Sequence, residues 1–342
     1  MHLMRQVVMT KPREIVVEDR ADPKIVEPTD AIIRLAATCI CGSDLWPYRG
    51  VQDVHHQVMG HEYVGVVEEV GREVTTIKVG DFVVGSFWAS DNTCEICQAG
   101  YQSHCVHRTV MGLIGTQSEL ARVPLADGTL VATPSQPDND LIPSLLAASD
   151  VLGTGWFAAV AANAGPGKTV AVVGDGAVGL LGILAAKQLG AERIIAFSRH
   201  AARQKLAREF GATDIIEERG DEGVAKVYAL TDGLGAHSVI EAVGTQEAMM
   251  QAIRSARSGG HVGFVGVSHG VNIPGELLFG TGIHLHGGPA PVRQYLPELI
   301  NLIWDRKIDP GKVFDLTLPL EQAAEGYRAM DERRAIKVLL TV

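Results

Sequence analysis

From the N-terminus to about Pro134, the apolar residues occur in short runs that are interrupted by glycine and proline. These runs are rich in β-branched residues and cover residues 14–17, 31–36, 63–70 and 82–85. Short runs of this composition between turn residues are typical of β-strands. This part of the chain is therefore predicted to form an irregular, largely antiparallel β domain.

The pattern changes at Thr169, where apolar strands begin to alternate with glycine turns and amphipathic helices. Strands are expected at 169–173, 193–197, 237–242 and 261–265, with helices beginning at Ala177, Ala201 and Gln246. Such alternation predicts a parallel, doubly wound sheet. The last stretch predicts a helix at 294–304, a strand at 314–318, a helix at 321–330 and a strand at 336–341.

These patterns predict an α/β protein with a first domain over residues 1–151, a second over 152–290 and a return to the first over 291–342. A chain of 342 residues exceeds the size at which one hydrophobic core usually stops growing, which supports more than one domain. The net charge of −10 argues against nucleic acid as a partner, because binding the phosphate backbone needs a basic face. With no signal-peptide pattern and no stretch of roughly 18 apolar residues, we expect a cytoplasmic protein with no membrane partner.

A glycine-rich motif follows directly on the strand expected at 169–173. It reads Gly174-Asp175-Gly176-Ala177-Val178-Gly179 and leads into a helix. In this context Gly174 allows a tight turn, Gly176 lets a pyrophosphate approach the backbone, and Gly179 allows close packing of helix on strand. The motif is interpreted as a dinucleotide-binding loop; the alternative is an ordinary turn.

The end of the next strand indicates which dinucleotide binds. A site selective for NAD places an acid on the ribose about 20 residues after the glycines. Here Ser198 and Arg199 stand at that distance, and Arg203 follows one helical turn later. Arginine offers paired donors to a 2′-phosphate and no acid repels the added charge, so NADP(H) is predicted over NAD(H). The alternative is that both arginines are solvated surface residues.

Residues that suit a metal ion come from separate segments of the β domain. Cys41 opens the sequence Cys41-Gly42-Ser43-Asp44, His61 lies in Gly60-His61-Glu62, and Asp150 precedes the second domain. A zinc ion with three protein ligands keeps one position open, as a catalytic site requires. The alternatives are that the cysteine and the histidine are core residues and that Asp150 caps a helix.

All five cysteines lie in the first third of the chain, a distribution that favours metal binding over disulfides. Three of them and one aspartate form the pattern Asp91-x-x-Cys94-x-x-Cys97-x7-Cys105. Four closely spaced donors are typical of a closed structural zinc site, in which aspartate is an unusual member. His104 or a water molecule are the alternatives to Asp91 as the fourth ligand.

The segment Gly60-His61-Glu62-x2-Gly65-x5-Gly71-x2-Val74 resembles the zinc signature of the medium-chain dehydrogenase/reductase family at every fixed position. With the other motifs, it makes nearly the whole chain similar to the zinc-dependent alcohol dehydrogenase branch. The resemblance implies a GroES-like catalytic domain and a Rossmann-type cofactor domain. It also implies that Cys41, His61 and Asp150 ligate zinc and that Glu62 lies near the metal.

The resemblance implies further roles for single residues. Ser43 would take the proton of the alcohol, Asp44 would orient His61, and Thr154 would lie behind the nicotinamide. Lys337, in the segment 335–339, would reach the cofactor pyrophosphate. The implied activity is hydride transfer between an alcohol or a carbonyl compound (an aldehyde or ketone) and NADP(H), by a homo-oligomer that is a tetramer or a dimer.

Three positions depart from the family pattern. Cys39 replaces a common glycine and is interpreted as an inert buried thiol. Trp46 stands where many relatives have the histidine that ends a proton relay, and an indole cannot accept a proton. The proton would then leave through the ribose or through His55 or His56. Asp91 is the third departure.

Three other functions are compatible with parts of this pattern. An NAD-dependent polyol, threonine or formaldehyde dehydrogenase would share the architecture. A catalytically silent NADPH-binding sensor would share the cofactor motif, but retention of Cys41, Ser43 and His61 together argues against it. A zinc-free quinone reductase would have no use for these ligands.

Overall fold

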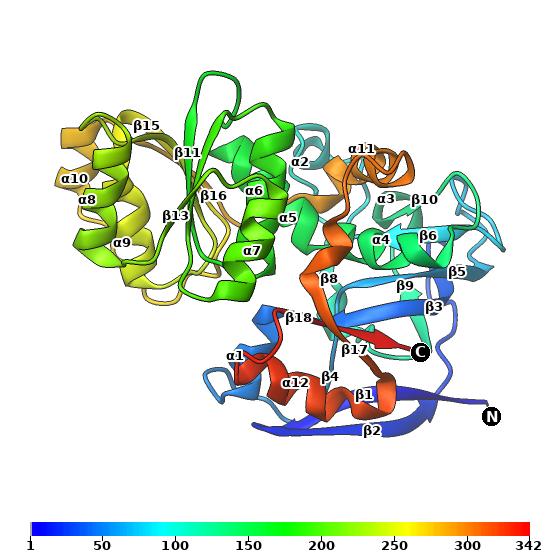
Figure 1. Ribbon diagram of the computed structural model, residues 1–342. Coiled ribbons are helices and arrows are strands. Elements are labelled where there is room, and N and C mark those ends of the chain that lie inside the picture. Colours follow the sequence, from blue (N-terminus) through cyan, green and yellow to red (C-terminus); the bar gives the residue numbers. More distant parts are fainter. Residues whose placement is uncertain (1) are drawn as a thin grey trace. The chain divides into compact units, whose positions relative to one another are not determined.

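The computed structural model describes residues 2–342, and the chain divides into two compact units (Figure 1). The first unit comprises Met1–Gly153 and Pro291–Val342, and the second comprises Thr154–Ala290. The boundary falls within helix α5 (Val151–Ala161). The predicted α/β class is confirmed, with antiparallel pairing predominating in the first unit and a parallel sheet in the second.

The main sheet of the first unit contains seven strands in the order β10-β6-β5-β3-β18-β17, with β9 paired to β3. The strands are β3 (Ala31–Ile40), β5 (Tyr63–Val70), β6 (Phe82–Gly85), β9 (Leu120–Val123), β10 (Leu130–Ala132), β17 (Phe314–Pro319) and β18 (Lys337–Thr341). Apolar side chains on alternate positions, among them Ile33, Val67 and Val83, are buried in one core cluster. The β-branched runs of the sequence thus become strands because one face of each packs on this core.

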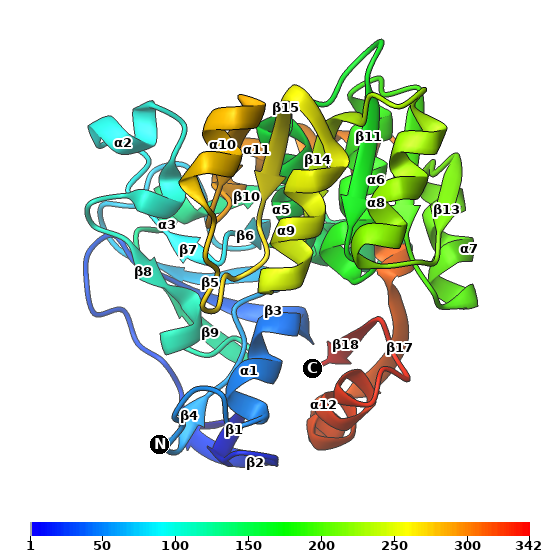
Figure 2. The same cartoon turned by 90° about the vertical axis from the view of Figure 1, so that its left-hand side faces the viewer.

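Two smaller sheets complete the β structure of the first unit. Strands β1 (Leu3–Lys11), β2 (Glu14–Ala21) and β4 (Gln57–Val58) form one in the order β2-β1-β4. Strands β7 (Trp88–Ala89) and β8 (Thr109–Val110) form the other. Figure 2 shows helix α2 (Glu95–Gln98), which carries part of the cysteine segment, near α3 (Ala126–Thr129).

The C-terminal segment contributes helices α11 (Val292–Trp304) and α12 (Ala323–Asp331) before its last strand. That strand, β18, pairs antiparallel with β3, with Val338 opposite Ile40 and Leu340 opposite Thr38. It is parallel to β17 on its other side. Residues from near both ends of the chain therefore share one sheet.

The second unit is a six-stranded parallel sheet in the order β13-β12-β11-β14-β15-β16. Its strands are β11 (Thr169–Val173), β12 (Arg193–Phe197), β13 (Asp214–Ile216), β14 (Ala236–Glu241), β15 (Ala256–Phe264) and β16 (His284–Gly287). Helices α6 (Ala177–Gln188) and α7 (Ala201–Phe210) cover one face, and α8 (Gly220–Leu230) and α9 (Gln246–Ser255) cover the other (Figure 1). Because both faces are covered, the central strands read as continuous apolar runs.

The second unit contains elements that the hydrophobic pattern did not predict: β13, α8, α10 (Gly275–Thr281) and β16. Strand β16 lies at the sheet edge and carries two exposed histidines, His284 and His286, so it lacks an apolar run. Strand β15 begins at Ala256, whereas the hydrophobic pattern predicted its start at residue 261. The first half of the strand was missed because Gly259 and Gly260 interrupt the apolar pattern.

Among residues 2–342, no single helix combines the length and the apolar character needed to cross a membrane, and one bent pair, Asn139–Ala148 with Val151–Ala161, meets that test only jointly.

Candidate active site and metal centres

Four predicted donors of the first unit come together in one cluster. Cys41, His61, Glu62 and Asp150 each offer a ligand atom, and these atoms lie within 4.8 Å of one another. The Nε2 atom of His61 is 3.2 Å from Asp150 Oδ2, and Cys41 Sγ is 3.8 Å from the same oxygen. The geometry therefore favours the metal-ligand interpretation of these residues over that of separate core residues.

Backbone geometry positions the two loop ligands. Cys41 follows β3 and caps a short 3-10 helix, Gly42–Asp44. Gly60, before His61, has a φ of +97°, and a Cβ there would lie 2.5 Å from the backbone nitrogen of Gln117. Only glycine allows both this left-handed conformation and this close approach, so Gly60 in the signature fixes where His61 lies.

Asp150 is positioned by its neighbour Ser149, which the sequence analysis did not single out. Tyr63 N–H, at the start of β5, donates to Ser149 Oγ at 3.0 Å, and Ser149 Oγ donates to the carbonyl of Gly85 at 2.6 Å. These bonds hold the start of α5 against the ends of β5 and β6. They bring Asp150 next to the imidazole that precedes β5.

The electrostatics of the cluster favour a cation. Burial lowers the pKa of His61, but the charges of Cys41 and Asp44 and a hydrogen bond to Asp150 raise it well above its usual value. Burial and Glu62 raise the pKa of the Cys41 thiol. A site whose acidic groups raise the pKa of an imidazole is also suited to a divalent ion. Sulfur, nitrogen and carboxylate donors together are a ligand set that zinc accepts.

Glu62 is shared between this cluster and a buried lysine. Lys337 Nζ donates to Glu62 Oε1 at 2.7 Å and to the carbonyl of Ile40 at 3.2 Å, while Glu62 Oε2 is buried and has no hydrogen-bond partner among residues 2–342. The unsatisfied oxygen is compatible with a metal ion beside it. Lys337 is 1% exposed, so its predicted contact with a pyrophosphate would require this ion pair to open.

A buried hydrogen-bond network supports the ligands from behind. Asp44 Oδ2 accepts from the backbone N–H of Cys41 at 3.0 Å, and Asp44 Oδ1 lies 3.6 Å from His61 Nδ1. Gln117 Nε2 donates to Asp44 and to the carbonyl of Cys39, and its Oε1 accepts from the Tyr327 hydroxyl at 3.1 Å. Sequence reasoning found Asp44 but missed Gln117 and Tyr327, which no local motif marks.

The residues assigned to proton transfer, Ser43, His55 and His56, are not part of this buried network. Ser43 is partly buried in the 3-10 turn, and its hydroxyl makes no hydrogen bond within residues 2–342. His55 and His56 are both exposed, and His56 Nε2 lies 3.1 Å from Glu18.

Cys39 is 1% exposed, and burial raises its pKa well above the usual value, which keeps the thiol protonated. A protonated, buried thiol reacts poorly, which agrees with the interpretation of Cys39 as inert.

A second cluster, called here the cysteine lobe, consists of Asp91, Cys94, Cys97 and Cys105, whose donor atoms also lie within 4.8 Å of one another. Asp91 Oδ1 accepts from the backbone N–H of Cys94 at 2.9 Å, and its Oδ2 lies 2.7 Å from His107 Nδ1. Burial opposes ionisation of Asp91, but these bonds lower its pKa overall. The ionised carboxylate therefore stands with the three sulfurs, whereas His104 is not in the group.

The glycine-rich loop of the second unit has the features expected of a dinucleotide site. Gly174 has a φ of +117°, and a Cβ on Gly179 would lie 2.0 Å from the carbonyl oxygen of Gly174. Gly176 is the N-cap of α6 and has open space where a side chain would be. Thr154, by contrast, is buried on α5, and its predicted place behind a nicotinamide stays a prediction.

The predicted phosphate-binding side chains are partly engaged within the protein. Arg199 is exposed and has no hydrogen-bond or ion-pair partner in the described part of the chain. Ser198 and Arg203 instead bond to Asp175, the acid within the glycine loop. Asp175 lies inside the glycine-rich motif, but no sequence pattern marks it for a role at the end of β12.

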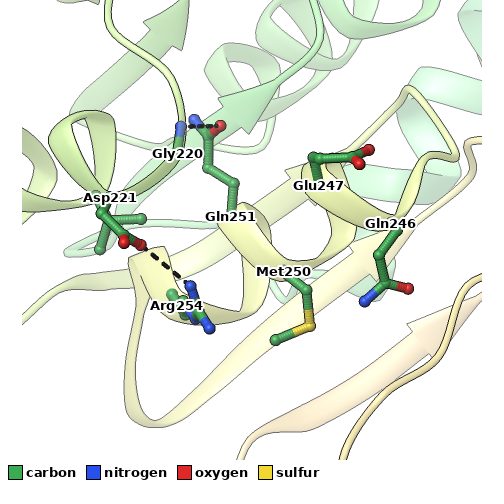
Figure 3. Close-up of a pocket in the computed structure, with 8 residues that line it drawn as sticks. Gly220, Asp221, Gln246, Glu247, Met250, Gln251 and Arg254 are labelled. Atoms are coloured by element: carbon green, nitrogen blue, oxygen red, sulfur yellow. Dashed lines mark hydrogen bonds and ion pairs between the residues drawn. The ribbon is translucent and has the colours of Figure 1, made fainter.

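A surface pocket of about 290 Å³ lies elsewhere in the second unit (Figure 3). It is bounded by α8 and α9 and lined by Gly220, Asp221, Val224, Gln246, Glu247, Met250, Gln251 and Arg254. None of the residues predicted to bind metal or cofactor lines it.

Two segments of the chain match known protein families. Residues 27–135 match the alcohol dehydrogenase GroES-like domain, and residues 177–305 match the zinc-binding dehydrogenase domain. The chain is 34% identical to zinc-type alcohol dehydrogenase B of Aspergillus flavus, over 98% of this chain and 81% of that one. It is 36% identical to a probable zinc-binding alcohol dehydrogenase of Mycobacterium tuberculosis, over 95% and 84% of the two chains.

A solved structure, alcohol dehydrogenase TADH from Thermus sp. ATN1, superposes with a TM-score of 0.91 at 33% identity, covering 99% of this chain and 100% of that one. Similarity of this extent covers both units and both donor clusters. The chain therefore belongs to the zinc-dependent alcohol dehydrogenase branch of the medium-chain dehydrogenase/reductase family.

Proposed function

We propose that this protein interconverts alcohols with aldehydes or ketones, using zinc held by Cys41, His61 and Asp150 and using NADP(H) in preference to NAD(H). The observation that carries the proposal is the convergence of these three ligands and Glu62 within 4.8 Å. When bound, zinc would polarise the substrate oxygen and the nicotinamide would exchange hydride. Residues of the chain would orient the ligands and move the proton.

The protein side chains supply ligand geometry and proton transfer. Asp44 faces His61 Nδ1, so the other ring nitrogen, Nε2, is left to act as a ligand. Glu62 adds a second carboxylate to the same cluster, and one of its oxygens, Oε2, has no hydrogen-bond partner among residues 2–342. The Ser43 hydroxyl, which has no partner among residues 2–342, would take up the proton of an alcohol while passing its own proton to the cofactor ribose, or to His55 or His56.

The preference for NADP(H) rests on Arg199, an exposed and unpaired guanidinium at the end of β12, and on the absence of an acid at the end of that strand. The relatives differ in this respect. An NADP-dependent isopropanol dehydrogenase of Entamoeba histolytica is 33% identical over 84% of this chain, whereas a structure named as an NAD-dependent alcohol dehydrogenase is 28% identical. An NAD-dependent enzyme of the same fold is therefore the second candidate.

The test combines metal analysis with turnover. Purified protein should contain zinc and should reduce short aldehydes or ketones faster with NADPH than with NADH. Asp150→Asn should lower kcat/KM by at least about 100-fold, because Lewis-acid polarisation contributes several kcal/mol and each ~1.4 kcal/mol is a factor of ten. Asp140→Asn, which neutralises an exposed carboxylate of the same unit, is the matched control.

The outcomes separate the candidates. A clear preference for NADH would replace the NADP(H) assignment with the NAD-dependent alternative. Protein that holds zinc and binds NADPH but turns over no member of a broad alcohol and aldehyde panel would instead be a silent sensor. A Cys41–His61 site that lacks metal, in protein that metal addition does not activate, would refute the proposal.

A further inference from the structure

The acid within the glycine-rich loop reaches the end of the neighbouring strand. Ser198 Oγ donates to Asp175 Oδ2 at 2.8 Å, and Arg203 Nη1 lies 3.0 Å from the Asp175 carbonyl oxygen and 3.4 Å from its Oδ1. The side chains of Arg203 and Asp175 are only 14% and 17% exposed. This is a packed arrangement of three polar groups, all of them in the second unit.

The position of the Asp175 group in the fold identifies the part of the cofactor that the group faces. In dinucleotide-binding folds, the glycine loop holds the pyrophosphate and the end of the second strand contacts the adenosine ribose. Ser198 immediately follows β12, the second strand of this sheet. The Asp175 carboxylate is therefore within hydrogen-bond distance of a residue at the ribose end of the site, although it comes from the loop.

This placement bears on the 2′-phosphate in two ways. The carboxylate is a negative charge close to where a phosphate carrying about −1.5 to −2 charges would bind. It also accepts a hydrogen bond from Ser198, one of the donors that the sequence assigned to that phosphate. Arg203 lies closer to the backbone carbonyl of Asp175, at 3.0 Å, than to its carboxylate, at 3.4 Å. Arg199 is the remaining donor, and within residues 2–342 it has no competing partner.

We propose that Asp175 is a specificity-determining residue that limits the preference of this enzyme for NADP(H) over NAD(H). Its carboxylate repels a 2′-phosphate and engages the Ser198 hydroxyl, whereas the two hydroxyls of an NAD ribose meet no such repulsion. The inference rests on the proposed function only in requiring that a nicotinamide dinucleotide binds at this loop.

Asp175→Asn tests the inference, because asparagine has nearly the same size and keeps an oxygen acceptor but removes the charge. The probes are 2′,5′-ADP and 5′-AMP, whose binding is measured by calorimetry without substrate. The variant should bind 2′,5′-ADP about tenfold more tightly, equivalent to about 1.4 kcal/mol, and 5′-AMP within about twofold of the wild type. The ratio of kcat/KM for NADPH to that for NADH should rise by a similar factor, mainly through a lower KM for NADPH.

Two further variants show where the effect arises. Asp221→Asn makes the same charge change at a side chain that is 89% exposed on α8, and it should leave the affinity ratio of the two nucleotides unchanged. In an Arg203→Gln background, Asp175→Asn should produce a similar gain, because the bond of Arg203 to the backbone carbonyl of residue 175 does not depend on the carboxylate. Asp175→Ala repeats the removal of charge should the asparagine variant be unstable.

The inference is overturned if 2′,5′-ADP binds the neutral Asp175 variants no more tightly than it binds the wild type. It is also overturned if Asp221→Asn shifts the ratio equally, since net charge alone would then be the cause. Wild-type protein that binds neither nucleotide nor either dinucleotide would overturn the proposed function as well. Nucleotide binding with no turnover would affect the proposed function alone.

Discussion

Lys337 and Glu62 form an ion pair of 2.7 Å inside the first unit, where their side chains are 1% and 0% exposed. The pair joins the last strand, β18, to the zinc-signature segment. Breaking such a pair by removing one partner leaves an uncompensated buried charge, which is far more costly than the loss of a surface pair.

Lys337→Met should therefore lower the free energy of unfolding by about 3–5 kcal/mol, measured by equilibrium urea unfolding. Lys226→Met, which removes an exposed partner of Glu218, should cost less than about 1 kcal/mol. Combining Lys337→Met with Glu62→Gln should recover part of the loss, since both charges are then absent. If Lys337→Met alone were as stable as the wild type, Glu62 would not be ionised in the folded protein.

Asp44→Asn should weaken zinc binding and lower kcat/KM by about 10–100-fold, because partners that orient metal ligands contribute effects of this size. The physical reason is that Asp44 lies 3.6 Å from His61 Nδ1 and accepts the N–H of Cys41. Competition with a chelating dye gives the zinc affinity, and initial rates give kcat/KM. Unchanged values of both would indicate that the network acts only on stability.

Cys105→Ser should reduce the zinc content by one ion per chain without emptying the Cys41–His61 site. The cysteine lobe would lose a metal crosslink, and the melting temperature should fall by on the order of 10 °C, given roughly 2–4 °C for each kcal/mol. Cys39→Ala is the control, because Cys39 is buried outside both donor clusters and its loss should leave zinc content unchanged. Equal zinc content in Cys105→Ser and the wild type would exclude a metal in the lobe.

Glu241, at the end of β14, should make the second unit sensitive to pH. Burial raises its pKa above the usual value of 4.5, although the backbone N–H groups of Gly244 and Val243 donate to it. The folded state therefore favours the protonated acid, so its contribution to stability is complete below about pH 4.5 and is lost as the pH rises through the raised pKa.

Glu241→Gln should remove this dependence, because the amide oxygen still accepts both N–H groups and carries no charge. The variant should gain stability relative to the wild type as the pH rises from 5 to 8, in thermal unfolding at a series of pH values. Glu222→Gln, an exposed position on α8, should show no such trend. A difference that is constant across this range would mean that Glu241 does not titrate there.

The sequence predicted those features whose residues lie close together along the chain. The glycine loop and the cysteine lobe are local motifs, and the apolar runs indicated the central strands correctly. The ligands Cys41, His61 and Asp150 were candidates because of their residue types, and only the family resemblance favoured them over the alternatives, since no spacing rule links segments so far apart.

What the sequence did not indicate are contacts that only the sheet order creates. Asp175 meets Ser198 because β11 and β12 are neighbours in the sheet, although 23 positions separate the two residues. Gln117 and Tyr327 are 210 positions apart, and Lys337 was considered only as a cofactor contact. Hydrophobic periodicity contains no information on such pairs, because it reports which face a residue occupies and not which residue it meets.

The position of β18 between β17 and β3 has a consequence for biosynthesis. Translation produces the whole of the second unit, which is continuous in sequence, before β18 leaves the ribosome. The second unit is therefore free to fold on the nascent chain. Until translation reaches Lys337, the first unit lacks β18, so the edge of β3 that β18 covers is unpaired and Glu62 lacks its buried partner. An unpaired strand edge is a template for pairing with another chain, so aggregation is a hazard of the incomplete protein.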